Sequence, residues 1–394
     1  MDCPLATKQA ITIGKKQVTI KDLDTLVRPA KQLAGIMPAS ELSHCKGPFD
    51  GKINSIFRLT YGTGESEKKL IFRARISEAF RYEAIVKEKL LFPILDGTLD
   101  LQSGVSVKDR IEKIVKTRAG SHVFAEDTPP IIPVQNLYQY DETKKRIPYM
   151  YSVMDFIPGV SLYDFLEENK VKGKKARDLP ASIVEKLDAT FMEAGEALGR
   201  LHTIIFPGFY KTITDIGNDS KQVNFKTLFL AKIKDRMKEV AKYKITEEIL
   251  PSLKKYFDET IELISDDEVP VLYHNDFQPQ NFIMLPEEGH LDGFIDFDNW
   301  QISIKEDDLV KMQYWGTRGL DPRFEKSFLS GYKKIQNLPG DFQARIDLLK
   351  MCWFILVIAF EMDKILKNEL NVTVDSRFPA VQEYINEIKK ILKI

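Results

Sequence analysis

Apolar residues in the first part of the chain recur at every second position over short stretches, which is the spacing of β-strands. Ile53, Phe57 and Leu59 predict a strand pair over 47–61, and the run 70–76 predicts a further strand after a Gly-Thr-Gly turn. The other elements expected in this part are helices over about 21–43 and 78–91 and strands over 131–140 and 148–154. The first part of the chain is therefore predicted to be rich in β-structure.

Helical spacing, with apolar residues three or four positions apart, dominates the chain beyond Pro158-Gly159. A strand-rich part followed by a helical part predicts an α+β protein of two lobes. We expect residues 1–154 to form a small β-rich lobe, with an inserted segment at about 96–130, and residues 155–394 to form a large helical lobe. The helices predicted in the second lobe cover 181–202, 225–243, 247–265, 342–367 and 379–392.

Composition agrees with a folded protein of more than one core and excludes several functional classes. The 394 residues exceed what one hydrophobic core comfortably serves. The chain has 57 basic and 58 acidic residues and no long run of one sign, so a nucleic-acid partner is not expected. Three scattered cysteines, no signal-peptide pattern at the first residues, and a longest apolar run of only 351–360 predict a cytoplasmic protein without a membrane span. Composition leaves the oligomeric state open.

The strongest chemical signal is the stretch 273–281, Tyr-His-Asn-Asp-Phe-Gln-Pro-Gln-Asn, followed by Ile-Asp-Phe-Asp at 295–298. It places His274, Asp276 and Asn281 in the order H-x-D-x-x-x-x-N, and Asp296 after an apolar strand. ATP-dependent phosphoryl transfer needs these groups, because one carboxylate orients the acceptor hydroxyl while an amide oxygen and a second carboxylate hold magnesium on the phosphates. The same polar residues in an ordinary loop would bond only their own backbone.

These motifs resemble those of the aminoglycoside phosphotransferase and choline kinase families, which share the protein-kinase-like fold. The resemblance covers roughly residues 45–335, apart from the segment 96–130. It implies ATP and Mg²⁺ as cofactors, Asp276 as the catalytic aspartate, and Asn281 and Asp296 as magnesium ligands. His274 is expected to support the loop by hydrogen bonding, and Asp308, within Asp-Asp-Leu, to steady the loop from behind.

The resemblance also implies nucleotide-binding residues in the first lobe. Protein kinases grip the phosphates with a lysine that pairs with a glutamate of the next helix. This chain has Arg73 and Arg75 on one strand face instead, and we favour Arg73, with Glu83 as its partner. Two surface arginines without such a role are the alternative. Asn54 matches the nucleotide loop of the family, and the linker Met154-Asp155-Phe156 is expected to meet adenine.

The acceptor is less well defined by the sequence. Asp298, Trp300, Tyr314 and Trp315 are candidates for the acceptor site, although Asp298 is equally well interpreted as a second metal ligand or a solvated neighbour, and aromatic residues at this spacing often pack in a helical core. His202, in Leu-Gly-Arg-Leu-His, is interpreted as a core residue. Glu361 and Asp363 would suit a cationic acceptor or a solvated helix face.

The favoured function is transfer of the γ-phosphoryl of ATP to a hydroxyl of a small molecule. An aminoglycoside-like antibiotic, choline, a sugar or a related metabolite would each fit. A protein substrate is less favoured, because the chain lacks the Ala-Pro-Glu segment of protein kinases and has little room for an activation loop. The alternative from another class is a nucleotide-binding pseudokinase that acts as a scaffold or regulatory partner.

Overall fold

The computed structural model describes most of both lobes. The segment predicted as an insertion, 96–130, lies outside the described residues, as does most of the predicted helix 78–91, including Glu83. Among the described residues, no helix combines the length and the apolar composition that crossing a membrane requires. The described residues are 10–37, 40–49, 53–77, 87, 90–91, 94–95, 132–367 and 374–394.

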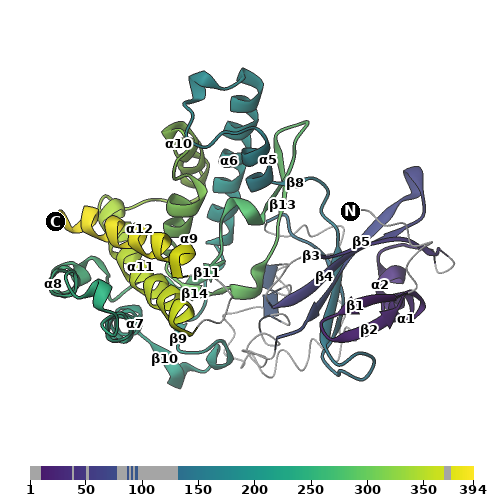
Figure 1. Ribbon diagram of the computed structural model, residues 1–394, viewed down its shortest axis with the longest axis horizontal. Coiled ribbons are helices and arrows are strands. Elements are labelled where there is room, and N and C mark those ends of the chain that lie inside the picture. Colours follow the sequence, from purple (N-terminus) through teal and green to yellow (C-terminus); the bar gives the residue numbers. More distant parts are fainter. Residues whose placement is uncertain are drawn as a thin grey trace.

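A five-stranded antiparallel sheet in the order β3-β4-β5-β7-β6 forms the small lobe, at the right in Figure 1. The alternation of residues along strand β5 explains why it belongs to a sheet with one buried face. One face carries the buried residues Leu70, Phe72 and Ala74, and the other carries Arg73 and Arg75. The sheet therefore directs both arginines away from the core of its own lobe. The strands are β3 (Leu42–Phe49), β4 (Asn54–Tyr61), β5 (Lys68–Arg75), β6 (Leu137–Asp141) and β7 (Met150–Asp155).

The first described residues form an element that the sequence pattern did not predict, a hairpin of β1 (Ala10–Ile13) and β2 (Lys16–Thr19). The single helix expected over 21–43 is instead two short helices followed by the first strand of the sheet, because Pro29 starts a new helix near its first turn. Buried side chains of both helices pack with the sheet in one hydrophobic core. These helices are α1 (Ile20–Leu26) and α2 (Arg28–Leu33).

The large lobe is helical and lies at the left in Figure 1. It also contains a three-stranded sheet in the order β13-β12-β8 and the strand pairs β11–β14 and β10–β9. The five helices predicted here are present, with α8 shorter than expected and α12 beginning five residues earlier. The helices are α5 (Leu162–Glu168), α6 (Ala181–Leu201), α7 (Phe225–Val240), α8 (Leu250–Thr260), α9 (Glu306–Lys311), α10 (Pro322–Lys333), α11 (Phe342–Lys367) and α12 (Val374–Leu392). The strands are β8 (Val160–Ser161), β9 (Phe209–Tyr210), β10 (Gln222–Val223), β11 (Val271–Tyr273), β12 (Phe282–Leu285), β13 (His290–Phe294) and β14 (Gln301–Ser303).

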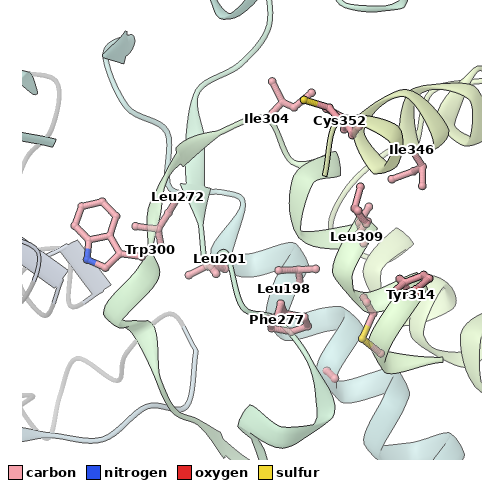
Figure 2. Packing of buried hydrophobic residues seen from close by; sticks show 14 of the residues in the cluster. Leu198, Leu201, Leu272, Phe277, Trp300, Ile304, Leu309, Tyr314, Ile346 and Cys352 are labelled. Atoms are coloured by element: carbon pink, nitrogen blue, oxygen red, sulfur yellow. The ribbon is translucent and has the colours of Figure 1, made fainter. Parts of the chain in front are cut away.

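Phe277 ties the predicted catalytic loop to the core of the large lobe. Its ring is fully buried and packs against Phe282 and Phe294, the ends of the strand pair β12–β13. Figure 2 shows it below Leu198 and Leu201 of α6. The loop residue next to the candidate catalytic aspartate is therefore an anchor, so that Asp276 projects from a fixed position.

Helices α6 and α10 touch through glycines. A Cβ atom on Gly331 would lie 1.9 Å from the Met192 carbonyl oxygen, and one on Gly195 would lie 2.0 Å from the Phe328 carbonyl oxygen. Contacts this short are impossible for real atoms, so only glycine allows the two backbones to approach this closely.

Gly331→Ala is therefore expected to lower the free energy of unfolding by about 2 kcal/mol, because the helices must move apart and lose packing. Chemical denaturation followed by circular dichroism measures the change. Gly340→Ala is the matched control, since nothing lies within 4 Å of a Cβ there. Equal midpoints for the two variants would contradict the close approach.

Candidate active site

Asp308 supports the loop that carries the H-x-D motif. Its carboxylate is fully buried and accepts hydrogen bonds from the backbone N–H groups of His274 and Asn275, both at 2.9 Å. The second support is His202 at the end of α6, whose Nε2 lies 3.2 Å from the Asp308 carboxylate and whose Nδ1 lies 2.8 Å from the Tyr332 hydroxyl of α10. The loop is thus held by residues from α9, α6 and α10 together. His202 is a core residue, as expected, and it also links Asp308 to Tyr332.

His274 is a structural member of the loop. Its Nδ1 accepts a hydrogen bond from the Asp276 backbone N–H at 3.2 Å, so its proton is on Nε2. The ring is fully buried, 4.2 Å from the Phe297 ring between centroids, and burial lowers its pKa. A neutral imidazole that already accepts a backbone hydrogen bond is suited to fixing the loop, as the sequence predicts, and poorly suited to exchanging protons.

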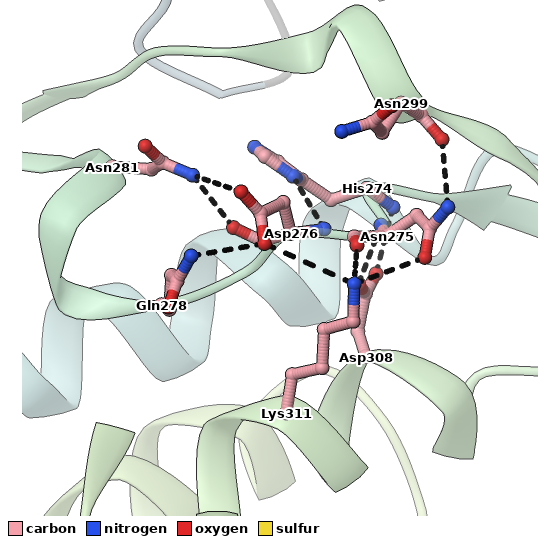
Figure 3. A network of polar contacts seen from close by, with 8 residues as sticks. All are labelled: His274, Asn275, Asp276, Gln278, Asn281, Asn299, Asp308 and Lys311. Carbon is pink, nitrogen blue, oxygen red and sulfur yellow. Dashed lines mark hydrogen bonds and ion pairs between the residues drawn. The ribbon is translucent and has the colours of Figure 1, made fainter. Parts of the chain in front are cut away.

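Asp276 projects from this loop with a defined orientation (Figure 3). Its Oδ1 accepts a hydrogen bond from Gln278 Nε2 at 2.9 Å, and its Oδ2 accepts one from Asn281 Nδ2 at 3.1 Å. Asn281 Nδ2 also donates to the Asp276 carbonyl at 2.8 Å. Since the nitrogen of the Asn281 amide faces Asp276, its oxygen is left to face away, which suits a metal ligand.

Asp296 is joined to the same site through the backbone. The Ile295 N–H donates to the Asn281 carbonyl at 3.0 Å, and Asp296 then turns in the left-handed conformation, at φ 64° and ψ 55°. Burial and the charge of Asp298 raise the pKa of Asp296 to about 6. A divalent cation would relieve this unfavourable charge, so the residues fit magnesium.

The number of expected protein ligands, two, also fits magnesium. Among the described residues, no group of three or more His, Cys, Asp and Glu side chains is placed to hold a metal. Asn281 and Asp296 would supply one amide oxygen and one carboxylate. Magnesium is commonly bound by one or two protein oxygens, with phosphates and water completing its coordination.

One polar contact between the lobes involves Asn54, Arg73 and Asp298, which we name the interlobe clasp. Arg73 Nη1 lies 2.5 Å from Asp298 Oδ1, and Asn54 Nδ2 donates to Asp298 Oδ2 at 2.8 Å. These bonds lower the pKa of Asp298 despite its burial, so it is a carboxylate at neutral pH. Asp298 therefore joins the second acidic motif to the β-sheet and is not merely a solvated neighbour. Its expected roles as a second metal ligand or an acceptor contact stay predictions.

A cavity of about 430 Å³ lies between the lobes, beside Asn281 and Asp296. Arg73 lines this cavity and also a second one of about 60 Å³ that shares several of its lining residues, whereas Arg75 lines only the smaller cavity. Of the two arginines, therefore, only Arg73 reaches the larger cavity. In the linker, Met154 and Phe156 line the cavity and Asp155 does not. Asp155 is turned to the side, where its carboxylate accepts from Asn136 Nδ2 at 2.7 Å. Cavity-lining residues include Ile53, Asn54, Ile56, Ile71, Gln135, Ile157, Ile283, Ile295 and Asn299.

The aromatic residues predicted for the acceptor site take three different positions. Trp300 is fully buried; its ring stacks near Phe206, and its Nε1 donates to the Lys87 carbonyl at 3.2 Å. Tyr314 is buried among the aromatic rings of α11 and α12. These two positions fit the core-packing alternative, because both side chains are buried. Trp315 is 39% exposed and remains a candidate.

Lys311 is a site residue that the sequence motifs did not indicate. It is the last residue of α9, and its Nζ lies 3.8 Å from Asp276 Oδ1. The nearest signal in the sequence is its place three residues after Asp308, one helical turn away on the same face. Only the fold brings this turn of α9 to the loop 35 residues earlier.

Comparison with solved structures identifies the fold. A putative aminoglycoside phosphotransferase from Ralstonia eutropha JMP134 is 16% identical, with a TM-score of 0.58 over 94% of this chain and 98% of that chain. A thermostable mutant of aminoglycoside phosphotransferase APH(4)-Ia, in a ternary complex with AMP-PNP and hygromycin B, is 13% identical, with a TM-score of 0.55 over 92% and 97% of the two chains. At these identities the likeness shows the bilobal protein-kinase-like fold alone.

Comparison by sequence identifies the family. No curated protein matches the chain. The model of the phosphotransferase enzyme family, however, matches residues 118–344. This match covers more than half of the chain and includes the loop from His274 to Asn281 together with Asp296 and Asp308. The chain therefore belongs to the phosphotransferase enzyme family.

Proposed function

We propose that the protein transfers the γ-phosphoryl group of ATP to a hydroxyl group of a small molecule, with magnesium as cofactor. The observation that carries this proposal is that Asn281 and Asp296 line one interlobe cavity while Asp276 is hydrogen-bonded to Asn281. A binding-only scaffold has no physical need for all three groups in this arrangement. Solved proteins of the same fold include one with bound ADP and one with AMP-PNP and hygromycin B, which supports the nucleotide.

In the proposed reaction the acceptor oxygen forms a bond to the γ-phosphorus as the bond from phosphorus to the β,γ-bridging oxygen breaks, and ADP leaves. Asp276 accepts the hydrogen bond of the acceptor hydroxyl, aims its oxygen in line, and receives the proton as the bond forms. When bound, magnesium would neutralise charge on the phosphate oxygens. Arg73 of the interlobe clasp is the phosphate-gripping cation of the small lobe, and Met154 and Phe156 contact adenine.

The lobes divide this work between residues 1–154 and 155–394. The sheet and the linker line the cavity on the nucleotide side, while the catalytic loop and the metal ligands come from the second lobe. The acceptor is then left to the face of Asp276 that the nucleotide does not occupy, beside α9 and α11. A small molecule is favoured over a protein, because the chain lacks the Ala-Pro-Glu segment of protein kinases.

The experiment that tests the proposal is a screen for ADP release with ATP, magnesium and a broad panel of hydroxyl compounds, followed by mass spectrometry of the products. A phosphorylated small molecule formed at a rate above ATP hydrolysis is the expected result. Tight binding of ATP and magnesium without transfer to any compound or to a general protein substrate would support the pseudokinase alternative. Phosphate on serine of the protein substrate alone would overturn the substrate class.

Asp296→Ala is expected to abolish magnesium-dependent nucleotide binding, because the metal loses the carboxylate of its expected pair of ligands, Asn281 and Asp296. Titration calorimetry with ADP and magnesium measures the affinity, and the circular dichroism spectrum should stay unchanged. Asp292→Ala, four residues earlier on β13, is the matched control. Unchanged affinity in Asp296→Ala would exclude this residue as a ligand.

A further inference from the structure

Lys311 places a fixed positive charge beside the proposed catalytic aspartate. Its Nζ lies 3.8 Å from Asp276 Oδ1 and 3.1 Å from Asn275 Oδ1, and it also donates to the Asn275 carbonyl. Its side chain is only 12% exposed. Burial lowers the pKa of Lys311, whereas the carboxylates of Asp276 and Asp308 favour its charged form.

Lys311 lies on the side of Asp276 opposite to Asn281, which lines the interlobe cavity. Asp276 Oδ2 meets Asn281, a residue of the interlobe cavity, whereas Oδ1 meets Gln278 and Lys311. Neither Gln278 nor Lys311 lines that cavity. Figure 3 shows Asn281 and Lys311 on opposite sides of Asp276. In an in-line transfer the acceptor approaches from the side opposite to the leaving group, so Lys311 is on the acceptor side.

The Lys311 ammonium lies among the carboxylates of Asp276, Asp308 and Asp307, of which Asp308 already accepts hydrogen bonds from the catalytic loop. The Lys311 ammonium lies 5.7 Å from the ring centroid of Trp315, which is partly exposed. The carboxylates of α11 that would suit a cationic acceptor are engaged elsewhere: Asp363 Oδ1 accepts from the Tyr243 hydroxyl at 2.5 Å, and Glu361 lies 3.6 Å from Lys364.

From this geometry we propose that Lys311 determines acceptor specificity, and that the acceptor is a neutral or anionic hydroxyl compound rather than a polycation. The inference rests on the proposed phosphotransferase function. A cationic acceptor would have to bring an ammonium group close to Lys311 in a partly desolvated site, where repulsion between like charges is only weakly screened. A hydroxyl, carboxylate or phosphate group of the acceptor would instead meet the ammonium and the Trp315 ring. Specificity here comes from a repulsive group as much as from an attractive one.

The test uses acceptors that share a skeleton and differ in charge. One set is glucose, glucosamine and glucuronate; another is choline and its neutral analogue 3,3-dimethylbutan-1-ol; kanamycin represents the polycations. The values of kcat/KM are measured for the intact protein and for Lys311→Met, Lys311→Arg and Lys311→Glu. Lys305→Met is the matched control, because Lys305 also belongs to the α9 region but donates to the Asn337 carbonyl, away from the site.

We expect the unmodified protein to disfavour the cationic member of each set at least tenfold in kcat/KM. Lys311→Met should reduce that discrimination at least tenfold, Lys311→Glu should invert it, and Lys311→Arg should keep it. A preference of the unmodified protein for kanamycin or choline would overturn the inference. An equal loss for every acceptor in Lys311→Met would also overturn it, because that result assigns Lys311 to loop support alone. Failure of every acceptor, with ADP and magnesium still bound, would instead overturn the proposed function.

Discussion

Replacing Asp276 by asparagine is expected to lower turnover by about 100-fold or more while leaving nucleotide binding intact. Asparagine keeps the size of the side chain but loses the negative charge that orients the acceptor hydroxyl and takes up its proton. Its amide also presents a donor where Gln278 Nε2 or Asn281 Nδ2 already donates. The measurement is the rate of ADP formation with the acceptor found in the screen.

The control for Asp276→Asn is the affinity for ADP and magnesium in the same variant. Asn281 and Asp296 are unchanged, so titration calorimetry should give an affinity within a few-fold of that of the unmodified protein. A turnover close to normal would refute Asp276 as the group that orients the hydroxyl. A loss of nucleotide affinity that matches the loss of turnover would show that the variant disturbs the loop rather than the chemistry.

Asp308→Asn is expected to have the largest effect on stability, lowering the free energy of unfolding by about 3 kcal/mol. The carboxylate accepts from the N–H groups of His274 and Asn275 and meets His202, all in a buried site. An asparagine has one acceptor oxygen, so its NH₂ group must face at least one buried donor. Turnover should also fall by at least tenfold, because the loop that carries Asp276 loses its main support.

Denaturant unfolding and the turnover assay check this prediction together. Asp267→Asn, at an exposed position before β11, is the matched control and should change neither quantity. If Asp308→Asn unfolded at the same denaturant concentration as the control, the buried network would not be holding the loop.

The sequence allowed the candidate site of the large lobe to be located, because short motifs carry it. His274, Asp276 and Asn281 lie within eight residues of one another, so their spacing determines which side chains leave the loop together. Phosphoryl transfer also restricts the residue types that can serve, and the fold and family expected from these motifs are confirmed by the comparisons. The periodic helices were predicted for a similar reason, since each pattern extends over several turns.

Features that depend on contacts between distant segments could not be predicted from the sequence. Lys311 reaches a loop more than thirty residues earlier, and the Arg73–Asp298 pair joins residues 225 positions apart. Trp300 shows a different limit. An aromatic residue after an acidic motif suits an acceptor wall and a core equally well, and only the position of Phe206 beneath its ring distinguishes the two.

The contact of α6 with α10 has a consequence for how substitutions in this protein would be interpreted. Tyr332, beside Gly331, meets His202, which in turn meets Asp308 behind the catalytic loop. Any side chain at position 331 therefore displaces α10, and with it the Tyr332 hydroxyl that completes this chain of contacts. In a saturation mutagenesis experiment selected for activity, Gly331 and Gly195 should be as intolerant as residues that touch substrate. An intolerance map would thus place these glycines in the active site, although their role is to set the spacing of two helices.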